Sequence, residues 1–283
     1  MAQPALDVFH ALDQALAAAV AAAAPSVVRV ARGHGDAGSG IVWSDDLVIT
    51  SSYHAPDRTR VDDRDAEVIG RDPGTDVALL RVTGGGLTPA SLRELTGLAV
   101  GNLALAVGRP GRTARASLRA IGVLGPAVRS PWGGQLDAYV ESDRPIPRGF
   151  AGGPLIDADG AVIGMNTRTL LRGADLAIPV VTLRRVVDEL RQHGGVRRGY
   201  LGVGAYPVQN PAGAIVASLD DGGPAATAGV LVGDVLVEVD GTAITGPDSL
   251  RTALHDRPGQ TVKLVLLRAG QRHELDVALG SKA

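Results

Sequence analysis

The chain has 283 residues, 45% of them hydrophobic and 20% charged, which is typical of a soluble globular protein of about two domains. Its net charge of −2 provides no basic surface for nucleic acid or an anionic membrane. There is no cysteine, which excludes disulfides, thiolate zinc sites and a cysteine nucleophile. No HExxH motif or paired histidine spacing occurs, so we expect neither a metal nor a cofactor.

The first predicted element is a helix over residues 6–23, with apolar side chains at steps of three and four residues. The run Ala15–Ala24 is apolar like the middle of a signal peptide, but Asp7 and Asp13 precede it and no basic residue does. We therefore predict an alanine-rich helix that ends before Pro25, and no membrane span. Localisation stays open: cytoplasmic as the chain is written, or periplasmic or cell-envelope if a signal has been removed.

From Pro25 onwards the sequence changes to short β-branched runs separated by Gly, Asp and Pro, which predicts a mainly β fold of the sandwich or barrel type. The runs are Ser26–Val30, Ile41–Trp43, Leu47–Thr50, Val77–Val82, Ala104–Val107, Ala138–Val140 and Ala161–Met165.

A second helix is predicted over Val181–His193, because the pair Gly194-Gly195 is a normal helix stop. The polar, basic residues 196–199 then form a plausible linker. Residues 200–283 contain further strands and one helix near Pro247–His255. The sequence thus divides into a helical segment (1–24), a first β domain (25–195), the linker and a second domain (200–283).

Three polar positions in the first domain follow the chain order His, Asp, nucleophile that one type of serine hydrolase uses. His54 follows an apolar strand, Asp76 stands at the mouth of another, and the segment Arg148–Leu155 would read GxSGGP if residue 151 were serine. Each of the three positions alone is more simply explained as a surface or turn residue. Their joint order, with each at the end of a strand, favours a catalytic site instead. The other histidines are expected at the surface: His10, His34, His193, His255 and His273.

The glycines of this segment have a physical role in such a site. A tight turn must direct two backbone N–H groups at one point, where a carbonyl oxygen becomes an oxyanion. Glycine at 149 and 152 tolerates the backbone angles that the turn needs. The predicted donors are the N–H groups of Gly149 and of Ala151, which alanine retains.

These motifs resemble those of the HtrA family of trypsin-like serine proteases, in order, from about residue 25 to residue 280. The matching segments are Gly38–Val42, Ile49–His54, Val68–Leu80, Gly152–Asp157, Gly164–Thr167, Ala177–Val180 and Arg198–Val203. The resemblance implies a chymotrypsin-like double β-barrel protease domain followed by a PDZ domain, with a short N-terminal helix. It also implies a catalytic triad at His54, Asp76 and position 151, and a role on unfolded or misfolded proteins in protein quality control.

Three departures from the family pattern concern the same site. Tyr53 precedes His54 and Ala55 follows it, where the family has AxHV, and Phe150 stands where Asn is common. Above all, Ala151 occupies the nucleophile position, and loss of such a serine costs on the order of a millionfold in turnover. We predict a chain that is catalytically dead as written.

Two origins of the alanine remain open. One is an engineered Ser→Ala change, which the retention of His54, Asp76 and both loop glycines favours. The other is a natural pseudoprotease that binds peptides or unfolded proteins. Serine at position 151 would restore proteolysis in the first case, and no single change would do so in the second.

The second domain resembles a PDZ domain. Tyr200, Leu201, Gly202 and Val203 are similar to its carboxylate-binding loop, and the Gly233-Asp234 pair and the following helix stand at matching places. Such domains receive peptide C-termini as an added strand.

The resemblance implies further features of the assembly. It implies a homo-oligomer, which is a trimer by family. The N-terminal helix would either contribute to the contacts between subunits or pack on its own barrel. The specificity pocket is expected around Ile163, Gly164 and Met165. Because no buried acid is present there, we expect the substrate to have a small aliphatic residue at the cleaved position.

Overall fold

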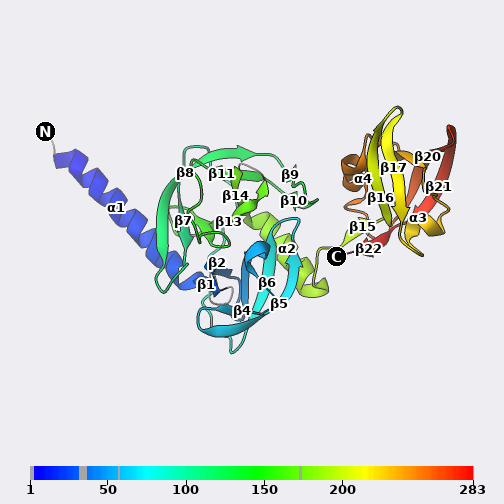
Figure 1. Cartoon of the computed structure of the whole chain (residues 1–283). Helices are drawn as coiled ribbons and strands as arrows, with labels where there is room; N and C mark the ends of the chain where they lie inside the picture. Colours follow the sequence, from blue (N-terminus) through cyan, green and yellow to red (C-terminus); the bar gives the residue numbers. More distant parts are fainter. Residues whose placement is uncertain (1–2, 32–36, 57, 172–173, 283) are drawn as a thin grey trace. The chain divides into compact units, whose positions relative to one another are not determined.

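The computed structural model describes residues 3–31, 37–56, 58–171 and 174–282. His34, one of the histidines expected at the surface, lies outside them. The chain forms two compact units, Met1–Gly195 and Val196–Ala283 (Figure 1).

The first unit contains two closed six-stranded barrels. The strands of the first are ordered β1-β2-β3-β6-β5-β4, and those of the second β11-β14-β13-β12-β7-β8. First-barrel bounds are β1 (Val27–Ala31), β2 (Ala37–Val42), β3 (Leu47–Ser51), β4 (Arg58–Val61), β5 (Arg64–Asp72) and β6 (Val77–Val82). Second-barrel bounds are β7 (Leu103–Gly108), β8 (Arg115–Gly125), β11 (Tyr139–Ser142), β12 (Pro154–Ile156), β13 (Val162–Leu171) and β14 (Ala174–Pro179).

Each barrel closes around its own apolar core, which explains the β-branched runs of the sequence. The first core is built from valines and leucines such as Val30, Val48 and Leu80. The second includes Ile121 and Phe150. Because inward positions of a closed barrel are filled by side chains, the barrels are rigid supports for the loops between them. A small hairpin of β9 (Val128–Arg129) and β10 (Gln135–Leu136) extends the second barrel.

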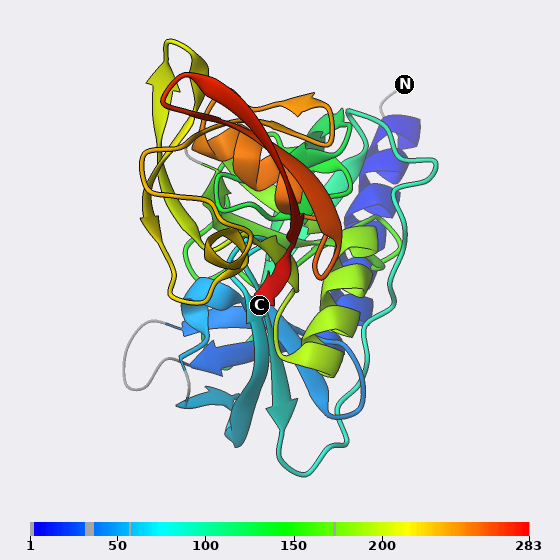
Figure 2. The same cartoon turned by 90° about the vertical axis from the view of Figure 1, so that its right-hand side faces the viewer.

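Helix α2 (Val180–His193) joins the two barrels. Its apolar face, which includes Leu183, Val187 and Leu190, is buried, and it contacts β5 and β6 of the first barrel as well as β13 and β14 of the second (Figure 2). Gly194 ends the helix with φ of 71° and donates its N–H to the carbonyl of Leu190. The predicted helix, Val181–His193, begins one residue later than the observed helix and ends at the same residue.

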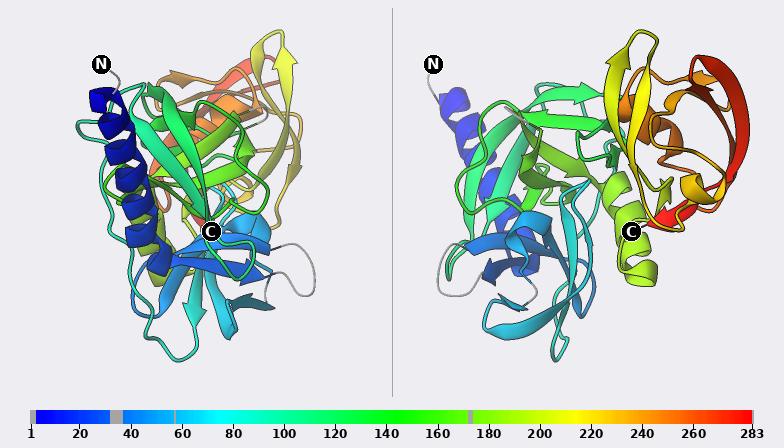
Figure 3. Two further views of the ribbon diagram at one scale, coloured as in Figure 1. Left: turned by 90° about the vertical axis from the view of Figure 1, so that its left-hand side faces the viewer. Right: turned by 45° about the vertical axis from the view of Figure 1, so that its right-hand side comes forward.

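Helix α1 (Gln3–Ala23) begins three residues before the predicted start, and its described side chains are mostly exposed except towards its C-terminal end (Figure 3). Ala19 and Ala23 are buried, and the turn at Gly160 approaches so closely that a Cβ there would lie 2.7 Å from the carbonyl oxygen of Ala19. By length and composition the stretch Asp7–Ser26 is apolar enough to cross a membrane, a property shared by signal sequences and core helices. No such stretch was expected from the sequence, where the same residues predicted only an alanine-rich helix.

The second unit is a twisted sheet ordered β16-β17-β18-β20-β21, with β19 beside β18 and a separate β15–β22 pair. The bounds are β15 (Arg198–Tyr200), β16 (Val203–Gln209), β17 (Ala212–Leu219), β18 (Val235–Val239), β19 (Thr242–Ala243), β20 (Thr261–Arg268), β21 (Gln271–Ala278), β22 (Gly280–Lys282), α3 (Pro224–Thr227) and α4 (Pro247–Leu254). Arg198 and Gly199, expected in the linker, therefore belong to a strand of this unit.

An ion pair between the buried Asp234 and the partly exposed Arg268 joins the start of β18 to the end of β20, and it predicts a pH dependence. Asp234, 1% exposed, accepts hydrogen bonds from Arg268 and from the N–H of Leu231. Burial alone would raise the pKa of Asp234, but these donors and the positive charge outweigh it, so its pKa lies below the ordinary value. A lowered folded pKa contributes stability that is present above the unfolded pKa of about 4 and is lost as the pH falls towards the folded pKa.

We therefore expect amide exchange in β18 and β20 to accelerate as the pH falls below about 4, after correction for intrinsic exchange. In Arg268→Gln the same acceleration should start at higher pH, because the buried carboxylate loses its main donor. Arg272→Gln, which removes an exposed pair with Glu238, is the matched control and should leave the onset unchanged.

Candidate functional site

The loop at position 151 has the tight turn that the sequence predicts. Gly149 and Gly152 both have positive φ, 83° and 82°. A Cβ at Gly152 would lie 2.3 Å from the carbonyl oxygen of Ser39, so only glycine fits. Ser39 holds the loop from β2: its hydroxyl donates to the carbonyl of Gly149 at 2.7 Å, and its N–H donates to the carbonyl of Ala151 at 3.0 Å.

The N–H groups of Gly149 and Ala151 are the predicted oxyanion donors. Across the described residues, neither of them donates to another backbone carbonyl. Phe150, between them, is 4% exposed and lies against the end of β7, where a Cβ on Gly108 would come within 2.8 Å of its ring. The aromatic ring therefore packs the turn against β7, and the role of the two N–H groups as oxyanion donors stays a prediction.

Asp76 lies at the start of β6 and is 4% exposed, with φ of 57°. Its carboxylate accepts hydrogen bonds from three groups. The hydroxyl of Ser51 lies 2.9 Å from both oxygens, the N–H of Tyr53 is 3.2 Å from Oδ1, and the hydroxyl of Thr167 is 2.6 Å from Oδ2. These donors from both barrels satisfy the buried charge.

Ser51 stands between Asp76 and His54. It is fully buried, and its Oγ lies 3.3 Å from Nδ1 of His54 while it also donates to the carboxylate. The hydroxyl of Ser51 thus contacts both the acid and the imidazole, and its distance of 3.3 Å to the ring is long for a hydrogen bond.

The imidazole of His54 nevertheless lies near position 151. A Cβ on Gly38 would come within 3.2 Å of Cγ of His54 and within 3.3 Å of the carbonyl oxygen of Ala151. The short 3₁₀ turn Ser52–His54 brings the ring there, edge-on to Tyr53. His54 therefore lies near the backbone of Ala151 and contacts Ser51, which bonds Asp76. Ala151 lacks the oxygen that a nucleophile needs, and the triad assignment stays a prediction.

A cavity of about 330 Å³ opens beside Asp76. Its walls include Tyr53 and Trp132, both more than 60% exposed, and Leu170 of β13. Strand β12 pairs with β13 only as far as Met165, so the later part of β13, which lines the cavity, has an unpaired edge among the described residues. An apolar cavity beside an unpaired strand edge is suited to an extended polypeptide.

The residues expected in the specificity pocket lie elsewhere. Ile163 and Met165 are fully buried on β13, and Gly164 between them is buried as well. Their side chains therefore fill the second barrel, and a role in specificity stays a prediction.

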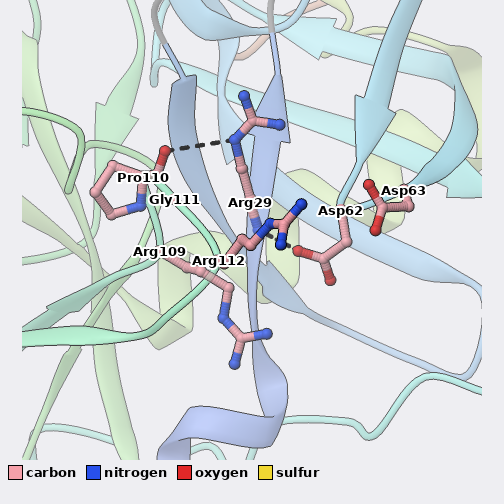
Figure 4. Close-up of a pocket in the computed structure, with 7 residues that line it drawn as sticks. All are labelled: Arg29, Asp62, Asp63, Arg109, Pro110, Gly111 and Arg112. Carbon is pink, nitrogen blue, oxygen red and sulfur yellow. Dashed lines mark hydrogen bonds between the residues drawn. The ribbon is translucent and has the colours of Figure 1, made fainter.

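A larger cavity, about 910 Å³, lies between β1 and the loop that follows β7 (Figure 4). It combines Arg29, Arg109 and Arg112 with the acids Asp62 and Asp63. Arg109 donates to the carbonyl of Ala24, Asp62 accepts the N–H of Arg29, and the three guanidinium groups point in different directions in Figure 4. The three arginines therefore do not converge on one point, as a common anion site would require, and the bonds of Arg29 and Arg109 link β1 and the turn before it to their surroundings.

The second unit holds a groove of about 520 Å³ between β16 and α4. All four predicted residues line it: Tyr200, Leu201, Gly202 and Val203. The N–H groups of Leu201 and Gly202 donate to no backbone carbonyl in the part of this unit that the structure describes. They are available to an anionic group, as the prediction requires.

Several contributors escaped the sequence analysis. Ser51 and Thr167 lie within quoted motifs, yet nothing in a sequence marks a buried hydroxyl as a carboxylate partner. Trp132 comes from the remote β9–β10 hairpin. His255, expected at the surface, is 5% exposed, because Arg198 donates to its Nε2 and Asp256 contacts its Nδ1. No group of three or more His, Asp or Glu in the described ranges could hold a metal ion.

Comparison with known domain families matches each unit separately. Residues 38–165 match the family of trypsin-like peptidase domains, and residues 199–279 match the PDZ domain family. With the two barrels and the N-terminal helix, these matches confirm the predicted fold class.

Curated proteins are similar to the chain across both of its units. The chain is 34% identical over 278 residues to a "Probable periplasmic serine endoprotease DegP-like" of Halomonas elongata, with 88% of this chain and 58% of that protein covered. A protein of the same name from Brucella suis is 33% identical, covering 86% and 52%. The chain thus spans little more than half the length of these curated relatives.

Solved structures extend the similarity to three dimensions. The "HtrA-type protease AlgW with decapeptide" superposes with a TM-score of 0.72 at 26% identity, covering 95% of this chain and 99% of that one. A serine endoprotease from Yersinia pestis superposes with a TM-score of 0.72 at 26% identity, covering 95% and 98%.

Proposed function

We propose that this chain, which joins a trypsin-like peptidase domain to a PDZ domain as HtrA-type proteases do, binds polypeptides without cleaving them. The observation that carries the proposal is Ala151 in a tight turn with positive φ at Gly149 and Gly152, the backbone form that an oxyanion loop requires. The loop retains what is needed to hold a carbonyl group, and it lacks the oxygen that would attack it. Binding without turnover is the function that such a site supports.

The link through Ser51 supports the same conclusion. In a working triad the acid contacts the imidazole directly, fixes its tautomer and stabilises the imidazolium that forms. Here Asp76 is satisfied by Ser51, Tyr53 and Thr167. The site departs from a catalytic triad at the nucleophile, and the buried hydroxyl of Ser51 contacts both the acid and the imidazole. We take these two features to favour a natural pseudoprotease over a single engineered change.

Two surfaces support polypeptide binding. The cavity at Trp132 offers apolar contacts beside the unpaired edge of β13, and the groove beside β16 offers N–H groups for a peptide carboxylate. We propose that unfolded polypeptides occupy the first and peptide C-termini the second. The decapeptide named with the AlgW structure is consistent with the binding of peptides by this chain.

Three wider properties belong to the same proposal. A role in protein quality control and a homo-oligomer, a trimer by family resemblance, follow from the kinship with HtrA-type proteases. A place in the periplasm or cell envelope follows from the names of the curated relatives.

A latent protease is the second candidate function. It is favoured by the position of the His54 ring, close to Gly38 and to the carbonyl of Ala151. The two candidates differ in what serine at position 151 would do.

A binding measurement tests the proposal. We expect the unaltered chain to bind an unfolded, C-terminally amidated polypeptide without cleaving it, with a change in tryptophan fluorescence as Trp132 is covered. Amidation removes the carboxylate that the PDZ groove would use. Trp132→Ala should weaken binding about tenfold, because a large aromatic contact is lost.

Val100→Ala is the matched control, since Val100 is 61% exposed on the same unit and lines none of the cavities described. It should leave affinity unchanged. No binding by the unaltered chain, or cleavage of the polypeptide, would refute the proposal.

A further inference from the structure

The groove of the second unit contains more positive charge than a terminal carboxylate needs. Its charged lining residues are Lys282, Arg251 and one acid, Asp220. We infer that this groove selects C-termini with an acidic side chain two residues before an apolar last residue. The inference rests on the proposed function, since it takes the groove to be a peptide site.

The direction of a bound peptide follows from the two ends of the groove. The end of α4 at Leu254 adjoins β15, where a Cβ on Gly199 would lie 2.0 Å from the carbonyl oxygen of Leu254. The loop with the available N–H groups lies at this end. At the other end, Gly246 precedes α4 and lies near Pro207 of β16. The last residue of a peptide therefore lies near Leu254 and the earlier residues lie towards Pro207.

Strand addition is possible on β16. It is an edge strand of the sheet, with β17 as its ladder partner, and its small residues Gly204 and Ala205 face the same groove as α4 (Figure 1). A peptide added there alternates its side chains, so that the last residue and the second before it face α4.

The last residue meets an apolar pocket. Leu201, Leu250 and Leu254 are each 4–5% exposed and line the groove together with Val203. Lys282 lies at this end, with its ammonium group 5.0 Å from the centre of the Tyr200 ring. The hydroxyl of Tyr200 donates to Asp220, so the single lining acid is bonded at this same end. Lys282 is thus placed for the carboxylate.

Arg251 is then left for a side chain of the peptide. It stands three residues before Leu254, about 4.5 Å back along the helix, and an extended peptide advances about 6.7 Å over two residues. A long guanidinium side chain spans that difference. Its partner in the free chain is Asp248, whose side chain is 97% exposed, and so fully solvated a partner is readily exchanged for a peptide carboxylate.

Fluorescence polarisation with labelled eight-residue peptides tests the inference on the full chain. The peptides end in Glu-Ala-X, Gln-Ala-X or Lys-Ala-X, where X is Val, Leu or Phe, and each has an amidated counterpart. We expect about fivefold tighter binding of the Glu than of the Lys form, and loss of binding on amidation. The preference should decrease at high salt.

Variants assign the preference to one side chain. Arg251→Ala should remove it, and Arg251→Glu should invert it, while each retains the dependence on a free carboxylate. Arg272→Ala, an exposed arginine of β21 outside the groove, should keep the preference.

Equal affinity for the Glu and Lys forms, with amidation still abolishing binding, would overturn the inference and leave the proposed function standing. A preference that survives Arg251→Ala would also overturn it. Failure of every free-carboxylate peptide to bind would remove the proposed role of the groove itself.

Discussion

The Ala151→Ser variant should digest casein at a turnover of only about 10⁻³ per second. Proteases with a complete triad typically turn over at about 10 per second, and loss of the acid's direct support of the imidazole costs about 10⁴-fold. In this chain the hydroxyl of Ser51 lies between Asp76 and His54, at 2.9 Å and 3.3 Å. We expect Ser51 to take up part of the carboxylate that would support the ring. A serine at position 151 would then have His54 as its base, but the imidazolium form of His54 would be poorly stabilised.

The double variant Ala151→Ser, Ser51→Ala identifies the cause. Removing the Ser51 hydroxyl frees part of the carboxylate, so labelling by a fluorophosphonate and casein digestion should both increase over the single variant. His54→Ala in the same background is the control and should abolish the increase. If Ala151→Ser alone cleaves at several turnovers per second and Ser51→Ala slows it, Ser51 transmits support to the imidazole, and the chain is a latent protease.

The two barrels were predictable because their strands are local patterns. Runs such as Val77–Val82 are short, apolar and bounded by turn residues, and Gly194-Gly195 ends α2 where the sequence indicates. The β15 strand was not predictable in the same way. Arg198 and Gly199 have a polar linker's composition and become a strand only because β22, more than 80 residues later, pairs with them.

The candidate site was predictable as a set of positions and not as a network. His54, Asp76 and Ala151 were found from chain order, and the positive φ of Gly149 and Gly152 agrees with the turn expected there. The contacts of the Ser51 hydroxyl with both the acid and the imidazole depend on rotamers and distances. The position of a histidine in a sequence motif does not determine which group its ring contacts.

The retention of Asp76 in a site without a nucleophile has a structural reason, and it predicts a large loss of stability. Asp76→Ala should lower the free energy of unfolding of the first unit by about 3–4 kcal/mol. It would leave the buried hydroxyls of Ser51 and Thr167 and the N–H of Tyr53 without their acceptor. Alanine is also strained at the positive φ of this position, 57°.

Denaturant unfolding followed by tryptophan fluorescence measures this loss in one unit alone, because both tryptophans, Trp43 and Trp132, lie in the first unit. Asp76→Asn is the control: asparagine tolerates positive φ and its amide oxygen still accepts hydrogen bonds, so it should lose only about 1 kcal/mol. A loss below 1 kcal/mol for Asp76→Ala would mean that the hydroxyls find other acceptors. Retention of the acid would then need a functional explanation, and the latent protease would become the stronger candidate. A loss of the expected size makes Asp76 a support for the junction of the two barrels, which is needed whether or not a peptide bond is ever cleaved there.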